Sequence, residues 1–202
     1  MLTRPKSPSV RPTTARSLAI RRGRSDVLQS LRRRGMSIDM SGVESLIAAC
    51  ALDEGSLLEE IRSAQPELVA QLRAEGATLI AEFAGAGNAR GVARLVDLGV
   101  PVDARYGGDP YFGTAPESTA LHVPAHRAWP KVIELLIARG ADVNARDAKG
   151  NTPLMNAVWA ATKSWWTGRR TPDGVRALLA AGASKDGISP PTGYAAIDEL
   201  LV

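Results

Sequence analysis

The stretch Thr119–Gly150, which reads TALHVPAHRAWPKVIELLIARGADVNARDAKG, contains the pattern that decides the fold. Its opening, Thr119-Ala120-Leu121-His122, returns 33 residues later as Thr152-Pro153-Leu154-Met155. Five apolar residues in its second half fall on one broad stripe of a predicted helix: Val132, Ile133, Leu135, Leu136 and Ala138. A fixed period of this length predicts a repeat architecture, in which each unit is stabilised by packing against its neighbours.

Each predicted unit has the same arrangement at the end of its second helix. A glycine follows the helix, where it takes a left-handed backbone conformation without a Cβ penalty: Gly99, Gly140 and Gly182. Four residues before each glycine lies a leucine that we expect to stack against its equivalents in the neighbouring units: Leu95, Leu136 and Leu178. Three threonines are expected to cap the first helices: Thr78, Thr119 and Thr152.

These residues resemble the ankyrin repeat, whose unit of ~33 residues is a β-turn followed by two antiparallel helices with a T-P-L-H-x-A signature. The resemblance implies an all-α, ankyrin-repeat solenoid of helix-turn-helix units with β-turn fingers, with about three full repeats and degenerate end caps. We expect one ankyrin repeat domain over 36–202, divided into repeats at about 43–75, 76–116, 117–149 and 150–192 and a half repeat at 193–202.

Two residues of the best-matched unit have a specific expectation attached. Pro124 stands where the family usually has Ala, and proline removes one helical hydrogen bond, so this first helix is expected to be short, bent or shifted. His122 occupies the position of the family's structural histidine. The resemblance therefore implies that His122 bridges backbone groups of adjacent fingers and is not catalytic.

Residues 1–35 differ from the rest of the chain in charge. They hold ten Lys and Arg side chains against one acid, Asp26, a net charge of +9, whereas 36–202 carries −5. With three prolines and Leu18-Ala19-Ile20 as the one apolar run, this segment is expected to be a disordered Arg-rich tail with at most a short helix around Leu18–Arg34.

Three interpretations of this tail stay open. An arginine arm attracts phosphates on nucleic acid or anionic lipid, and an Arg- and Ser-rich start with few acids is also typical of an organelle transit peptide. The third interpretation, which the sequence favours, is that translation begins at Met36 or Met40. Helix signals start just after these two methionines, and none is evident before them.

Two spacings are longer than the repeat requires. The finger from Gly99 to Thr119 exceeds the finger from Gly140 to Thr152 by eight residues, and nine extra residues around Thr162–Arg170 separate the two helices of the last full unit. Insertions in repeat proteins map to loops and often to the binding face. Here they carry aromatic side chains: Tyr106, Tyr111, Phe112, Trp165 and Trp166. Arg169 and Arg170 are interpreted as solvated loop charges.

The resemblance also implies where a partner would bind, because ligands of the family lie along the concave surface formed by finger tips and first helices. Lys149 and Asn151 match the finger tip, His126 and Arg127 match one first helix, and Trp159 matches the next. Two aromatics of the long finger complete the candidate partner-binding residues: Tyr111 and Phe112. Tyr, Trp and Arg are the residues that most often dominate binding energy.

A competing interpretation concerns Trp159. The second insertion would fold back and cover it with Trp165 or Trp166, which would make these side chains structural rather than interfacial.

The composition argues against several classes of protein. A single cysteine, Cys50, excludes a disulfide framework and a cysteine-based zinc site within one chain, and we expect it to be a small buried hydrophobe. No apolar run approaches the ~18 residues that a membrane helix needs. We find no Gly-rich phosphate loop followed by Lys, no nucleophile elbow and no carboxylate pair attached to a pocket. We therefore expect a non-enzyme with no catalytic residue, no metal and no cofactor.

The resemblance implies a protein–protein interaction scaffold or adaptor that binds a partner protein through the concave groove and the two insertions. The alternative is an accessory nucleic-acid or anionic-surface binder that works through the Arg-rich tail. We expect the folded body to be a monomer that binds protein rather than nucleic acid. The Ala- and Arg-rich composition suits a bacterial genome of high G+C content, for which the cytoplasm is the simplest compartment.

Overall fold

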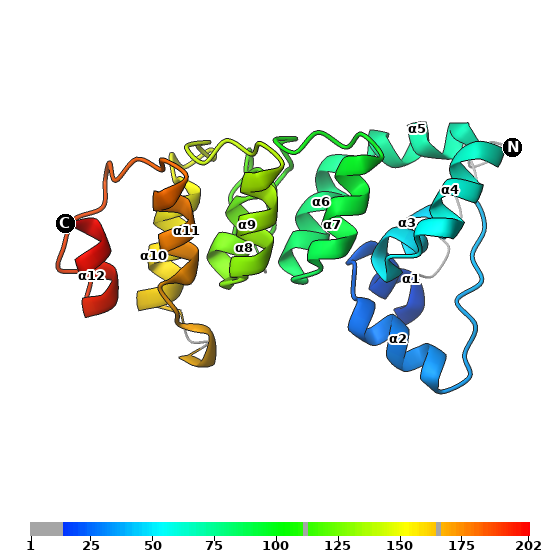
Figure 1. Cartoon of the computed structure of the whole chain (residues 1–202), viewed down its shortest axis with the longest axis horizontal. Coiled ribbons are helices and arrows are strands. Elements are labelled where there is room, and N and C mark those ends of the chain that lie inside the picture. The colour runs from blue at the N-terminus through cyan, green and yellow to red at the C-terminus, as the bar shows by residue number, and fades with distance from the viewer. Residues whose placement is uncertain (1–13, 111–112, 165–166) are drawn as a thin grey trace, which may run out of the picture.

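The computed structural model describes residues 14–110, 113–164 and 167–202, and over these residues the chain is an all-α solenoid of stacked helix pairs (Figure 1). Three pairs form its regular part, followed by one helix of a further unit. They are α6 (Gly76–Gly85) with α7 (Ala89–Asp97), α8 (His122–Arg127) with α9 (Pro130–Ala138), α10 (Pro153–Thr162) with α11 (Asp173–Ala180), and α12 (Ala195–Leu201). The predicted fold class is confirmed.

The helices stack in two rows. An inner row runs through α6, α8 and α10, and an outer row runs through α7, α9 and α11, with each helix packed on its neighbour in the same row. The stacking leucines Leu95, Leu136 and Leu178 are fully buried, as predicted. Gly99, Gly140 and Gly182 have φ values of 88°, 84° and 87°, which confirms the left-handed helix ends.

The starts of the first helices differ from the prediction in two units. Thr119 binds the ring of His122 but does not cap α8, whose N-cap is Leu121. Thr152 caps α10 as predicted, by accepting a hydrogen bond from Met155 N. Thr78, in contrast, lies inside α6 and caps nothing, because this helix already begins at Gly76. The helix that contains Pro124 has only six residues, which agrees with the expected short helix.

The residues before Met40 give the largest correction. Helices α1 (Ala15–Arg21) and α2 (Ser25–Arg33) precede α3 (Val43–Leu52), α4 (Gly55–Ala64) and α5 (Pro66–Ala74). Helix α1 packs on α3 and α6, and α3 packs on α7, so α1 and α3 continue the inner and outer rows. The prediction that 1–35 is a disordered tail is therefore wrong for 14–35, and 1–13 lie outside the described residues.

The physical reason is that this segment buries apolar side chains and neutralises much of its charge. Ile20 and Leu28 are fully buried, although the sequence offers only a short apolar run around them. The arginines then face acids of the repeats: Arg21 binds Glu44 and Glu75, Arg22 lies 3.7 Å from Glu82, and Arg32 binds Glu54. The charge density of the segment predicts disorder, because the acids that pair with its arginines lie far away in the sequence and do not enter a local count of charge.

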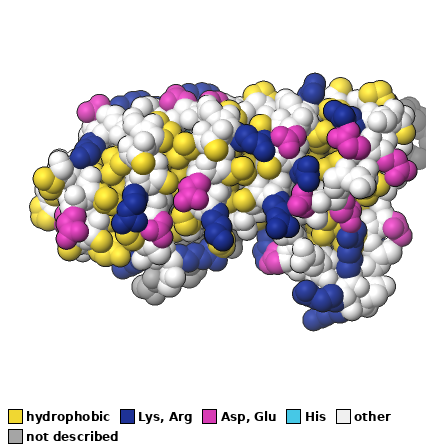
Figure 2. Space-filling view, in the orientation of Figure 1, with side chains coloured by type: hydrophobic (Ala, Val, Ile, Leu, Met, Phe, Trp, Pro, Cys, Tyr) yellow, Lys and Arg dark blue, Asp and Glu magenta, His cyan; other side chains and the backbone are white. Residues whose placement is uncertain are grey.

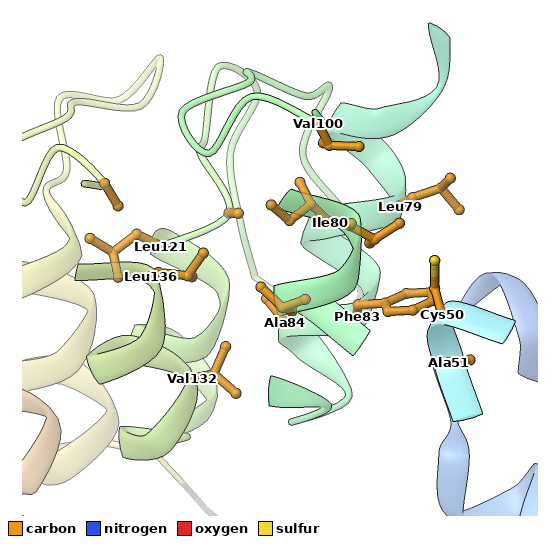
Figure 3. Close-up of a cluster of buried hydrophobic side chains, with 14 of the residues drawn as sticks. Cys50, Ala51, Leu79, Ile80, Phe83, Ala84, Val100, Leu121, Val132 and Leu136 are labelled. Atoms are coloured by element: carbon orange, nitrogen blue, oxygen red, sulfur yellow. The ribbon is translucent and has the colours of Figure 1, made fainter. Parts of the chain in front are cut away.

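Phe83 fills the junction between this N-terminal part and the regular repeats. It is fully buried, and its ring points from α6 toward Cys50 of α3 (Figure 3). Two glycines make room for it, because a Cβ at Gly23 or Gly91 would lie 2.5 or 2.6 Å from ring atoms. Cys50 is fully buried as predicted, and burial raises the pKa of its thiol to about 12.

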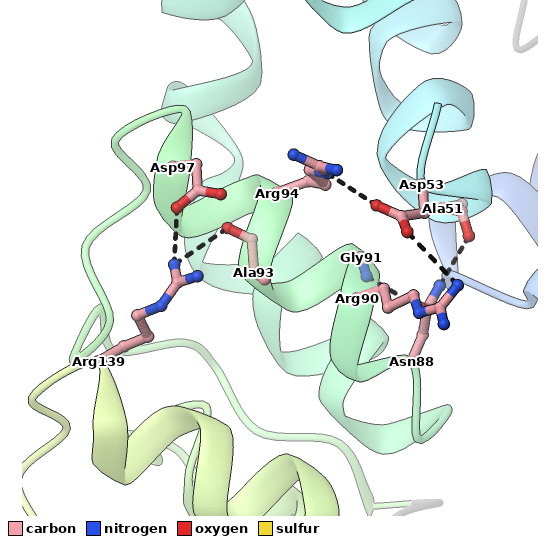
Figure 4. A network of polar contacts seen from close by, with 9 residues as sticks. All are labelled: Ala51, Asp53, Asn88, Arg90, Gly91, Ala93, Arg94, Asp97 and Arg139. Atoms are coloured by element: carbon pink, nitrogen blue, oxygen red, sulfur yellow. Dashed lines mark hydrogen bonds and ion pairs between the residues drawn. The ribbon is translucent and has the colours of Figure 1, made fainter. Parts of the chain in front are cut away.

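Polar side chains join the outer helices across the same boundaries (Figure 4). Asn88 donates from Nδ2 to the carbonyl oxygens of Gly23 and Ala51 while its Oδ1 caps α7. Arg94 on α7 donates to Asp53 at 2.8 Å, and Arg139 at the end of α9 donates to Asp97 at 2.7 Å. Each bond links one helix pair to the pair before it.

The first prediction tests the role of α1 in the fold. Ile20→Ala should lower the free energy of unfolding of the full chain by about 2–5 kcal/mol, because the side chain is fully buried. Leu18→Ala on the same helix is the matched control, since Leu18 is 45% exposed and should cost little. Urea denaturation of both variants would measure this. Equal, small effects would show that α1 does not pack on the repeats.

The second prediction tests the leucine stack. Leu136→Ala removes a fully buried side chain from the centre of the outer row and should cost about 2–5 kcal/mol. Because coupling in a repeat array runs between nearest neighbours, the loss should appear in the unfolding of the whole chain. A thermal melt of the variant beside Leu57→Ala, which changes a half-exposed leucine of α4, measures the difference. An unchanged melt for Leu136→Ala would contradict the stacking register.

Candidate partner-binding surface

The finger tip that carries Lys149 and Asn151 is organised by a buried carboxylate. Asp147 Oδ1 accepts hydrogen bonds from the backbone N–H groups of Lys149 and Asn151, and Asp147 Oδ2 accepts one from Asn151 Nδ2. The bonds close the turn around Gly150, which has a φ of 78°. The Lys149 side chain is left exposed, whereas Asn151 is half-buried and mainly holds the turn.

His122 connects this finger to the inner row. Its Nδ1 accepts a hydrogen bond from Thr119 N at 3.1 Å, so the neutral ring carries its proton on Nε2, which donates to Asn151 O at 3.1 Å. Burial lowers the pKa of His122. This arrangement bridges two neighbouring units through backbone groups, which is the structural role that the family resemblance implied.

His126 and Trp159 form a stacked pair at the other end of the inner helices. The ring centroids are 4.4 Å apart and the planes are inclined by 11°. His126 is the residue before the last of α8, and Trp159 lies near the end of α10, at equivalent positions of adjacent units. Burial and the charge of Arg127 lower the pKa of His126. Trp159 is 40% exposed, so one part of the ring covers His126 and another remains open.

The structure therefore brings some of the predicted site residues together and separates others. Trp159 contacts His126, but it lies seven residues beyond Thr152 on α10, which is about 10 Å along a helix from the finger tip. Lys149 and Asn151 thus sit at one end of the inner surface and His126 with Trp159 at the other. Arg127 follows His126 and lines a cavity together with Glu82, whose pKa is raised by burial. Two predicted residues, Tyr111 and Phe112, lie outside the described residues.

The long finger folds onto the inner helices. Tyr106 pairs with Ser118, and Asp109 with Thr114, in two isolated antiparallel bridges that make a narrow loop. The ring of Tyr106 is buried against Ala81 of α6 and Val123 of α8, and burial raises the pKa of its hydroxyl to about 12. The first insertion thus contributes a buried aromatic side chain, Tyr106, that packs against the inner helices.

The second insertion carries two arginines that differ from their prediction as solvated loop charges. Arg170 donates to Ser164 O, which closes the loop after α10. The guanidinium of Arg169 lies 4.1 Å from the centre of the Trp129 ring, a cation–π distance. The two aromatic residues of this insertion, Trp165 and Trp166, lie outside the described residues, so the competing interpretation of Trp159 stays open.

Metal binding and membrane insertion are each considered over the described residues. Within 14–110, 113–164 and 167–202, no group of three His, Cys, Asp or Glu side chains is arranged to hold a metal ion. Over the same residues, no helix has the length and apolar character needed to cross a membrane.

The third prediction concerns acid stability. The pKa of His122 is lowered in the folded state, so the unfolded chain binds protons more readily once the pH falls through ~6.5, the ordinary histidine pKa. The protein should therefore be most stable above this pH and lose up to about 1.4 kcal/mol per pH unit below it for such a group. His122→Gln should flatten the dependence between pH 7.5 and 5.5 in urea denaturation.

His126→Gln separates the contributions, because the pKa of His126 is lowered too. Each variant should remove part of the slope. A slope that is the same in wild type and in His122→Gln would mean that His122 is not kept neutral by its place between Thr119 and Asn151.

Comparison with known proteins agrees with the geometry. Residues 119–164 match the family model described as ankyrin repeats (many copies). A stretch of 85 residues is 33% identical to serine/threonine-protein kinase 12 of Arabidopsis thaliana, which is 42% of this chain but only 17% of the kinase. Ankyrin repeats generally mediate protein–protein interaction and are typically non-enzymatic. Over its described residues the chain is an all-α solenoid of helix pairs, and its match to ankyrin repeats falls on the units that carry the His126–Trp159 pair.

Proposed function

We propose that this protein is a non-catalytic adaptor that binds a partner protein through the concave inner surface of its repeats. The centre of the contact is the His126–Trp159 pair. Arg127, Lys149 and Asn151 contribute from the same side, and the two insertions, with Tyr111 and Phe112, extend the contact.

The observation that carries the proposal is the exposure of Trp159. Of the large hydrophobic side chains exposed in the described parts of the chain, it is the aromatic one. The equivalent residues of the two earlier pairs are Gly85 on α6 and His126 on α8, so packing within the repeat does not require an indole at this position. An apolar aromatic held in place by a stacked histidine is well suited to anchor a partner side chain.

The alternative, a nucleic-acid or anionic-surface binder that uses the Arg-rich segment, has less support. Several of the arginines between 14 and 35 bind acids of the same chain, among them Arg21, Arg24 and Arg32. Ion pairs of this kind reduce the positive field that would attract phosphates. The proposal also includes a cytoplasmic and monomeric protein, and the single cysteine is consistent with a reducing compartment.

The fourth prediction tests the aromatic anchor. Trp159→Ala should leave the melting temperature nearly unchanged and weaken the bound partner by at least ~1–2 kcal/mol, as truncation of an interfacial aromatic does. The full chain is immobilised, proteins retained from lysate by the wild type are compared with those retained by Trp159→Ala, and the Kd of the differential protein is then measured with purified components. Leu57→Ala is the matched control, because it removes an exposed apolar side chain from α4, away from the groove.

The opposite pattern would contradict the proposal. If Trp159→Ala lowers the melting temperature while its folded fraction binds as tightly as the wild type, the ring is part of the packing, as the fold-back of the second insertion would require. Loss of binding in both Trp159→Ala and Leu57→Ala would indicate a nonspecific apolar contact.

A further inference from the structure

Two additions to the repeat array project from the same edge of the solenoid. Figure 1 shows α2 and the loop after α10 both extending beyond the helix pairs, on the edge opposite the finger loops. The first belongs to the N-terminal segment and the second to the insertion between α10 and α11. In the same orientation, Figure 2 shows Lys and Arg side chains on the projection formed by α2 and along the lower edge beside it.

A cavity of about 240 Å³ lies between these additions. Four guanidinium groups from three separate parts of the chain line it: Arg22, Arg24, Arg127 and Arg169. Two carboxylates, Asp26 and Glu82, also face it, so the lining keeps an excess of positive charge. Arg24 binds both oxygens of Asp26, and that pair is largely exposed.

Trp129 forms the floor and is fixed on several sides. Its Nε1 donates to Gly85 O at 3.0 Å, and its ring lies so close to Gly87 that a Cβ there would be 2.8 Å from it. The guanidinium of Arg169 covers the ring at 4.1 Å from its centre. This contact holds Arg169 at the edge of the cavity although it comes from a loop.

A second cavity of about 430 Å³ adjoins the first and shares Trp129 and Arg169 with it. Its lining includes Ala128, Pro130 and Val132 together with Gly87, and one side chain of each charge, Lys131 and Asp173. The Trp129–Arg169 pair thus separates an arginine-rich compartment from a more apolar one. A ligand that fits both must present negative charge next to an apolar group.

We propose that this edge of the protein is a second binding site, which takes an acidic peptide segment of a partner protein. Carboxylates of the segment would bind the guanidinium groups in the smaller cavity, and one large apolar side chain would enter the larger cavity. Arginine suits this role because its planar group binds a carboxylate through two parallel hydrogen bonds. The site shares Arg127 with the surface proposed around Trp159, but neither His126 nor Trp159 lines its cavities, so it does not depend on that groove being functional.

A peptide fits the two cavities better than a nucleic acid does. Single-stranded nucleic acid binds by stacking bases on exposed aromatic rings, but Arg169 and Gly87 occupy the space over the Trp129 ring. Glu82 and Asp26 would also repel a continuous phosphate backbone, whereas single carboxylates can avoid them.

The test uses the full chain and a synthetic peptide with a fluorescent label, in which one Leu is flanked on each side by two Glu or Asp residues. Fluorescence anisotropy at low salt should give saturable binding with a Kd below about 1 mM, the weakest affinity that the method resolves well. A peptide with Lys in place of every acid, and one with Gly in place of the Leu, should each bind at least ~10-fold more weakly, since they remove the charge and the apolar contact.

Protein variants then locate the site. Arg24→Gln and Arg169→Gln should each weaken the acidic peptide about 10-fold, the change expected for one charge-assisted hydrogen bond. Arg62→Gln is the matched control, because it removes an exposed arginine of α4 that pairs with Glu59 and should leave the Kd unchanged. Circular dichroism confirms that each variant is folded. Trp159→Ala should not alter peptide binding, which keeps this test separate from the groove.

Three results would overturn the proposal. One is no saturation with the acidic peptide at about 1 mM. Another is an equal loss in Arg62→Gln and in the two cavity variants. The last is tighter binding of an oligothymidine of about 12 nucleotides or of anionic lipid vesicles, lost in Arg24→Gln and Arg169→Gln, which would assign the arginines to a phosphate surface.

Discussion

A helix pair of this solenoid cannot bury both of its faces by itself, and the remaining features of the molecule follow from that constraint. Leu95, Leu136 and Leu178 are fully buried only because each is covered by the next pair. The bonds of Asn88, Arg94 and Arg139 lie across the same boundaries, so polar and apolar contacts reinforce each other there. Stability is therefore a property of the boundaries between pairs rather than of the pairs.

The first regular pair shows how the chain meets this need at its N-terminal side. Phe83 would be exposed on α6 without a preceding unit, and α1 with α3 supply the missing surface. Gly23 and Gly91 leave room for that ring because they have no Cβ atom. The acids Glu44, Glu75 and Glu82 then give the arginines of α1 partners close enough to offset their mutual repulsion. Apolar packing and ion pairs together allow residues 14–35 to fold onto the repeats, although the composition of this segment is typical of disorder.

The sequence alone predicts the features that repeat and misses those that depend on distant partners. The glycine at each helix end and the leucine before it recur in every unit, so their roles follow from comparison within the chain. Helix α1 has no such counterpart, because its acids lie between 23 and 60 residues away. The same limit applies to the site. The repeat positions of His126 and Trp159 predict their place on the inner surface, whereas no sequence signal joins Arg24 to Arg169, which line one cavity.

Tyr106 also restricts how the inner surface can be used. Its ring is wedged between α6 and α8, and Gly113 of the same loop is so close to His126 that a Cβ would lie 2.7 Å from Nε2. A long ligand that followed the inner row from α1 toward α12 would collide with this loop midway. The accessible length of the concave surface is accordingly divided into two short stretches, and the C-terminal one begins at His126. Under the proposed function, the concave surface would accept a compact protrusion of a partner more easily than a long extended strand.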